Sequence, residues 1–175
     1  LCRRLYELGH RNIAFVSSST NSTAVGQRYK GYRLYCEKMG LRSFSYTDVR
    51  SMLPGMSRQS VRSRDVVELV RFLRENHSVT AVVAHTYQVG KMVCEAIHQL
   101  GYEVPRDYSV VCFDAPQRVE EEEWFSHIQQ DEFNLGVRAV QCLVQRIEGK
   151  TVPQFNYVEG KFVDGKSCAR APEWL

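Results

Sequence analysis

Polar side chains that could bind a ligand follow short apolar runs at three places in the sequence. His85 and Thr86 follow the run Val79–Ala84, and Asp114 directly follows a second run. The small polar stretch 17–23, SSSTNST, follows a third. Imidazole, hydroxyl and carboxylate groups offer hydrogen-bond donors and acceptors to a polar molecule. We therefore expect a ligand-binding site where these runs end.

Arg28 could supply a cation to the same site. It falls in the first turns of the helical pattern Val25–Met39, shortly after the polar stretch that contains Ser22. A guanidinium can bind a hydroxyl pair or a carboxylate through two parallel hydrogen bonds. Two plainer interpretations stay open, with Arg28 as a surface arginine and the polar stretch as a flexible loop. The position of the stretch, at the same kind of strand end as His85 and Asp114, favours binding and makes Ser22 a candidate.

His85 and Asp114 could also act as a general base and the carboxylate that orients it. A hydrolase built on them would take its nucleophile from residues 17–19, because Cys112 lies inside an apolar strand pattern. The sequence contains no G-x-S-x-G, Walker, G-x-G-x-x-G or H-E-x-x-H motif. We therefore expect a binding protein rather than an enzyme, with no catalytic residue, metal or cofactor. A small hydrolase is the less favoured alternative.

One βαβ unit positions two of these polar ends. A helical pattern with apolar residues at Val89, Val93 and Ile97 separates the two apolar runs, and Gly101 and Pro105 end it. Strand, helix and strand in this order predict two parallel strands joined by a crossover helix. In such sheets ligands bind beyond the carboxyl ends of the strands.

The rest of the chain continues the alternation of helices and strands. Further helices are expected at 1–8, 25–39, 65–76 and 132–148, further strands at 13–16 and 156–163, and a short extended crossing at 126–130. Residues 41–50 are ambiguous, and residues 51–63 are typical of a loop. Apolar runs without alternation indicate strands covered on both faces. The predicted fold class is therefore α/β, with a doubly wound, mainly parallel sheet.

Two charged clusters and one aromatic pair leave alternatives open. Arg58, Arg62 and Arg64 could face phosphates, and the acidic run 120–123 could hold a metal. A solvated segment explains each cluster better. The aromatic pair at 124–125 could close over a ligand or anchor its own loop, and the sequence does not decide between these roles.

Composition excludes several classes of protein. The chain has 175 residues, 43% hydrophobic and 25% charged, with a net charge of +3. This mild charge offers no basic stripe for nucleic acid, and no apolar run is long enough for a membrane span or a signal peptide. Six scattered cysteines without a C-x-x-C motif indicate a reducing, cytoplasmic compartment.

Several motifs in order resemble one family of proteins. They are LGHRNIAFV, the R-x-x-G-Y of residues 28–32, LGYEVPRDYSVVCFD, and IQQD followed by LGVRAV. This order is similar to the effector domain of the lactose-repressor/galactose-repressor transcription factors, and the similarity spans nearly the whole chain. Regulators with a winged-helix DNA-binding domain can carry the same module.

The resemblance implies a fold of two α/β lobes hinged around a ligand cleft, as in periplasmic sugar-binding proteins of type I. By this comparison residues 1–130 form the carboxyl-terminal lobe. Residues 131–150 form a helix of the largely absent amino-terminal lobe, and residues 151–175 form a return strand and tail. The apolar face of the 132–148 helix, which needs a partner, fits this division.

The resemblance also implies binding residues. Arg28 matches an arginine that grips ligand hydroxyls or a carboxylate, Asp114 matches an aspartate that accepts ligand hydrogen bonds, and Gln130 matches a polar residue at the crossing between lobes. His85 and Thr86 stand where the family usually has Asn-Asp. An imidazole offers one donor and one acceptor when neutral and ordinarily titrates near neutrality. A second departure puts Cys112 where the family usually has glycine before the Phe-Asp pair.

The expected function is therefore the ligand-sensing lobe of a bacterial DNA-binding transcriptional regulator. A small polar, sugar-like effector would shift the lobe arrangement and hence operator binding. The expected partners are that effector, operator DNA through a domain outside this chain, and a second copy in a homodimer, with no membrane. The alternatives are an exported solute-binding protein of a transport system and a module without a ligand retained for dimerisation.

Overall fold

The two apolar runs of the βαβ unit form neighbouring parallel strands, β3 (Ala81–Ala84) and β4 (Ser109–Phe113). The computed structural model describes residues 1–18, 22–49, 58–115 and 124–173. Within these ranges one sheet has the strand order β2-β1-β3-β4-β5-β6. Its other strands are β1 (Ile13–Ser18), β2 (Ser43–Val49), β5 (Ser126–Gln129) and β6 (Lys161–Val163). All neighbours are parallel except the β5–β6 pair, so the predicted fold class is confirmed.

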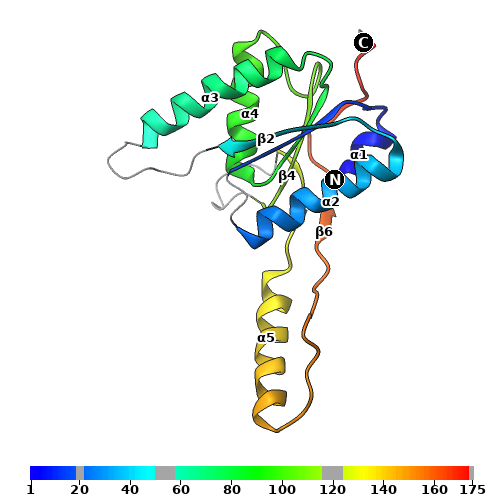
Figure 1. The fold of residues 1–175 in the computed structure, drawn as a ribbon, viewed down its shortest axis with the longest axis vertical. Helices are drawn as coiled ribbons and strands as arrows, with labels where there is room; N and C mark the ends of the chain where they lie inside the picture. Colours follow the sequence, from blue (N-terminus) through cyan, green and yellow to red (C-terminus); the bar gives the residue numbers. More distant parts are fainter. Residues whose placement is uncertain (19–21, 50–57, 116–123, 174–175) are drawn as a thin grey trace.

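Helices cover both faces of this sheet (Figure 1). The helices α1 (Cys2–Glu7) and α2 (Thr23–Met39) pack on one face, and α3 (Arg58–Glu75) and α4 (Tyr87–Gln99) pack on the other. Each central strand sends alternate side chains to the two layers, as a pleated strand requires. β3 and the inner part of β4 are therefore buried along their length.

Two expected boundaries were wrong. The helix expected at 65–76 begins at Arg58, so the end of the expected 51–63 loop is helical. The serines and arginines of RQSVRSR suggested a loop, yet arginine and glutamine are good helix formers. The strand expected at 156–163 is paired only over Lys161–Val163, because its short partner β5 offers few residues to pair with.

The helix α5 (Glu132–Ile147) extends away from the sheet, and the chain returns beside it to β6 (Figure 1). Asp131 caps its start, where a carboxylate oxygen accepts a hydrogen bond of 3.0 Å from the backbone N–H of Asn134. Its apolar side chains remain open, with Phe133 78% and Ile147 77% exposed. The helix therefore contributes little to the core of the sheet.

A buried histidine joins the opposite, amino-terminal edge of the sheet to the end of the chain. His10 lies within 2.9 Å of the hydroxyl oxygens of Thr80 and Ser109, and its Nε2 lies 3.2 Å from the carbonyl oxygen of Ala169. The backbone N–H of Ala171 also donates to the carbonyl oxygen of Leu8, at 2.9 Å. Burial lowers the pKa of His10. These hydrogen bonds hold the C-terminal segment, residues 164–171, against the amino-terminal ends of the strands.

Candidate functional site

Asp114 takes a backbone conformation that aspartate adopts only with strain. It directly follows β4, and its φ of 70° lies in the left-handed region. Aspartate and asparagine enter this region more readily than other side chains except glycine. Strained residues of this kind concentrate at functional sites, and here the turn brings the carboxylate to the carboxyl-terminal edge of the sheet.

Arg28 reaches this carboxylate from α2. Its Nη2 donates to Oδ1 of Asp114 at 3.1 Å, and its Nη1 donates to Oδ2 at 3.3 Å. Nη1 also donates to the carbonyl oxygen of His85 at 2.6 Å. The guanidinium lies over the ring of Phe113, 4.6 Å from the ring centre. These contacts hold the arginine in one position between β3 and β4.

Gln130 completes the group from the crossing that follows β5. Its side-chain amide donates to Oδ1 of Asp114. Arg28, His85, Asp114 and Gln130 are far apart in the sequence, and the structure brings them to the same edge of the sheet. The carboxyl ends of neighbouring parallel strands meet there, which is the reason that the sequence pattern could anticipate the cluster.

The imidazole of His85 is kept neutral at physiological pH. The residue is only 7% exposed. Burial first, and then the positive charge of Arg28, lower its pKa to about 4, against an opposing effect of Asp114. The ring therefore presents one donor and one acceptor, and it does not titrate near neutrality as an ordinary histidine would.

The other two candidates lie at helix starts. Thr86 is the N-cap of α4, where its hydroxyl oxygen accepts a hydrogen bond of 3.3 Å from the backbone N–H of Val89. Ser22 is the N-cap of α2 and is exposed, with no side-chain capping bond. Residues 19–21 of the polar stretch lie outside the described ranges. Thr86 thus has a clear structural role, whereas Ser22 is exposed at the start of the helix that carries Arg28.

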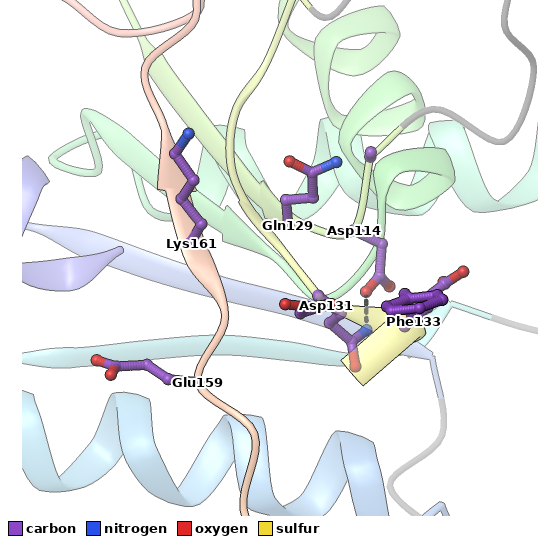
Figure 2. A pocket seen from close by; sticks show the side chains of 9 residues that line it. Asp114, Gln129, Asp131, Phe133, Glu159 and Lys161 are labelled. Atoms are coloured by element: carbon purple, nitrogen blue, oxygen red, sulfur yellow. Dashed lines mark hydrogen bonds between the residues drawn. The ribbon is translucent and has the colours of Figure 1, made fainter. Parts of the chain in front are cut away.

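A cavity of about 840 Å³ opens beside Asp114. Its walls come from the end of β4, the crossing after β5, the start of α5 and the return to β6 (Figure 2). Figure 2 shows Asp114 and Asp131 on one side and Glu159 and Lys161 on the other, and Gln130 also lines the cavity. A volume of this size is in the range of small-molecule sites.

Several residues at or beside the site were missed by the sequence reasoning. Phe113 could have been found, because strand alternation places its ring on the α2 face, where Arg28 lies. Glu159 and Lys161 carried no such signal, since their place at the cavity depends on the antiparallel return of the chain after α5. Of the aromatic pair at 124–125, Phe125 is 2% exposed and packs edge-on against Tyr87, which supports an anchoring role.

The position of Cys112 in the sheet makes it unsuitable for nucleophilic chemistry. Cys112 is fully buried in β4 and burial raises the pKa of its thiol, which makes it a poor nucleophile. Across the described ranges, no group of three or more histidine, cysteine, aspartate or glutamate residues could hold a metal. The acidic run 120–123 lies outside those ranges. Of the arginines at 58, 62 and 64, only Arg64 has a side chain that the structure describes. Among the helices described, none is long and apolar enough to cross a membrane.

Comparison with known proteins points to one family. A model of the periplasmic binding protein-like domain matches residues 2–168. The HTH-type transcriptional repressor PurR of Mannheimia succiniciproducens is 27% identical over 153 residues, which make up 85% of this chain and 42% of PurR. The chain therefore spans less than half the length of this relative.

Solved structures share the fold over almost the whole chain. The lac repressor dimer bound to operator and the anti-inducer ONPF aligns with a TM-score of 0.79 at 22% identity, over 96% of this chain and 56% of that one. A periplasmic binding protein/LacI transcriptional regulator from Alkaliphilus metalliredigens, complexed with D-xylulofuranose, gives 0.71 at 17% identity, over 95% and 60%.

Proposed function

Because the chain belongs to the periplasmic binding protein-like domain family, we propose that it is the effector-sensing lobe of a bacterial DNA-binding transcriptional regulator. The observation that carries this proposal is the Arg28–Asp114 pair, held at the strand ends beside an open cavity. The regulator names of the relatives support it over an exported transport protein and over a hydrolase.

The effector in this proposal is a small polar molecule, sugar-like in its hydroxyl groups. The similar regulator from Alkaliphilus metalliredigens holds D-xylulofuranose, which supports this class. Arg28, His85, Asp114 and Gln130 would contact it, with Thr86 and Ser22 at the rim. All of these residues lie at or near the carboxyl ends of the strands, where open α/β sheets bind ligands.

Sensing requires a second structural unit that responds to the ligand. In the proposed division, residues 1–130 form the carboxyl-terminal lobe, 131–150 form a helix of the other lobe, and 151–175 return and complete this one. The open apolar face of α5 supports this division. An effector that binds between the lobes shifts their arrangement only by its differential affinity for the two states. We extend the proposal to a cytoplasmic homodimer whose operator contacts lie in a separate DNA-binding domain.

A thermal melt tests this function. The chain is melted alone and with sugars, sugar phosphates, purines and amino acids. At a hundredfold excess over Kd, a ligand that binds only the folded state stabilises it by about 2.7 kcal/mol, which raises Tm by roughly 5–10 °C for a domain of this size. A cooperative melt that no compound moves, either in this chain or in a longer protein containing both lobes, would contradict the sensor function.

Two substitutions test the site itself. Arg28→Ala and Asp114→Ala should each weaken binding of the compound that moves the melt by about 1.5–3 kcal/mol, the scale of hydrogen bonds to charged groups. Isothermal calorimetry measures the change. Arg33→Ala, an exposed arginine one to two turns further along α2, is the matched control and should bind normally. Unchanged affinity in both site variants would place the ligand elsewhere.

A further inference from the structure

We propose that one surface of the α1–α2 layer is a docking site for an acidic, partly apolar segment of a partner protein. It lies on α1 and the carboxyl-terminal half of α2, which lie together in Figure 1 and away from α5. We call it the Arg–Tyr surface, and its residues are Arg3, Tyr6, Arg11, Leu34, Tyr35 and Lys38. None of them lines the cavity beside Asp114, so the proposal is independent of effector binding.

Charge is distributed unevenly between the two helical layers. Residues 1–42, which contain α1 and α2, have eight lysines and arginines against two acids, a net charge of +6. Residues 64–107, which contain α4 and most of α3, have five against six, a net charge of −1. Arg4 and Arg28 are paired with Asp164 and Asp114, and without these two arginines the first stretch still has six cations against two acids. The α1–α2 layer therefore attracts an acidic partner.

Arg11 is held in place with part of its guanidinium free. Its Nη1 donates to the backbone carbonyl oxygens of Tyr6 at 2.9 Å and His10 at 3.1 Å. The guanidinium also lies over the Tyr6 ring, 3.9 Å from the ring centre. No ion pair among the described residues involves Arg11 or Lys38. Because a guanidinium has further N–H donors on Nε and Nη2, Arg11 presents a pre-positioned fork for a carboxylate at a low cost in side-chain entropy.

Aromatic and aliphatic side chains lie beside this cation. Tyr6 of α1 and Tyr35 of α2 meet edge to face, with ring centres 6.4 Å apart. Leu34 precedes Tyr35 on α2 and is 54% exposed. Tyrosine and arginine are the residue types that contribute most to the binding energy of protein interfaces. The surface therefore suits a segment that carries both carboxylates and apolar side chains.

The same contacts favour a protein over a nucleic acid. Arg11 lies over the Tyr6 ring and Tyr35 meets that ring edge-on, so the ring offers little surface on which a base could stack. Glu7 lies 3.9 Å from Arg3, with its side chain 58% exposed, and its charge repels a phosphate backbone. A protein partner can place a lysine opposite Glu7, whereas a nucleic acid strand has phosphates along its whole length.

A labelled peptide that repeats the unit Glu-Glu-Leu is the probe. Its binding to the whole chain is followed by fluorescence anisotropy at low and at physiological salt. We expect saturable binding that weakens as salt screens the charges. A peptide that repeats Gln-Gln-Leu has the same apolar side chains without the carboxylates, and it should bind at least about tenfold more weakly.

Substitutions locate the binding. Arg11→Gln should weaken the peptide at least about tenfold, because it removes charge-assisted hydrogen bonds to a carboxylate. Arg11→Lys keeps the charge without the fork and should recover only part of the affinity. Arg74→Gln, at an exposed position on α3 in the opposite layer, is the matched control and should bind as the unaltered chain does.

Three results would overturn the proposal. The first is no binding of the Glu-Glu-Leu peptide, and the second is equal affinity of Arg11→Gln and Arg74→Gln for it. The third is displacement of the peptide by a DNA oligonucleotide at a lower concentration than by unlabelled peptide, which would assign the surface to nucleic acid. If Arg11→Gln does not melt cooperatively, Lys38→Glu replaces it, and unchanged affinity in that variant has the same meaning.

Discussion

At the scale of single residues, His85 has a consequence for stability that is separate from ligand binding. Its ring is neutral in the folded chain, with a pKa of about 4, whereas an unfolded histidine titrates near 6.5. Between these values the unfolded state binds more protons than the folded state. The stabilisation is therefore complete above about pH 6.5 and is lost as the pH falls toward 4.

His85→Asn should remove this dependence. We expect the free energy of unfolding of the unaltered chain to fall by up to about 3 kcal/mol more than that of His85→Asn between pH 6.5 and 4. Urea denaturation at a series of pH values measures the difference. His98→Asn, on the exposed side of α4, should keep the full dependence. Parallel profiles for the unaltered chain and His85→Asn would show that the ring does not lose its proton on folding.

The sequence predicted which residues meet at the site, but it did not predict the backbone conformation of Asp114 or the protonation state of His85. The strand ends placed His85 and Asp114 together, because that follows from parallel pairing alone. The left-handed turn at Asp114 and the neutral state of His85 depend on burial and on Arg28, which no local pattern reveals. Which of the six candidate residues touch the effector remains a prediction.

At the scale of elements, one hydroxyl group joins α2 to two strands. The hydroxyl oxygen of Tyr32 lies 2.8 Å from the carbonyl oxygens of both Ile13 and Phe44, and it accepts from the backbone N–H of Phe44 at 2.9 Å. Burial raises the pKa of this phenol. The contact fixes α2, and with it Arg28, over β1 and β2.

Tyr32→Phe should destabilise the chain by about 1–3 kcal/mol, because it leaves buried backbone groups without their partner. Equilibrium unfolding in urea gives the value. Tyr35→Phe, one turn along the same helix and only partly buried, should change stability by less than about 0.5 kcal/mol. Equal effects of the two substitutions would argue against a special role for the Tyr32 hydroxyl.

The element boundaries show where local pattern fails. The strongly periodic α4 and α5 begin and end within about two residues of their expected limits. The start of α3 was missed because its first residues lack apolar periodicity. The length of β6 was missed because a strand ends where its partner ends, and the partner is chosen by the tertiary fold.

At the scale of the whole molecule, α5 carries an apolar surface that nothing in the described chain covers. Leu143 is 60% and Val140 is 61% exposed, and neighbouring residues are similar. Contiguous apolar surface of this kind marks an interaction site or causes association. The helix should therefore affect how the chain associates much more than how stably its sheet folds.

Leu143→Glu tests whether α5 affects association without affecting folding stability. It should change the free energy of unfolding by less than about 0.5 kcal/mol, while lowering the self-association measured by sedimentation. Leu69→Ala, on the buried face of α3, should cost about 2–5 kcal/mol. A large loss of stability in Leu143→Glu would mean that α5 packs on the lobe in solution.

The C-terminal segment also has a consequence for synthesis on the ribosome. The partners of His10 and of Arg4 include Ala169 and Asp164, about 160 positions later. The contacts at the amino-terminal ends of the strands cannot form until Asp164 and Ala169 have left the exit tunnel. Both residues are synthesised after α5 and the segment that returns from it. A nascent chain halted at α5 would contain β1 to β5 but would lack the contacts that Asp164 and Ala169 make with Arg4 and His10. Such chains expose apolar surface and unpaired strand edges, which are the substrates that chaperones bind.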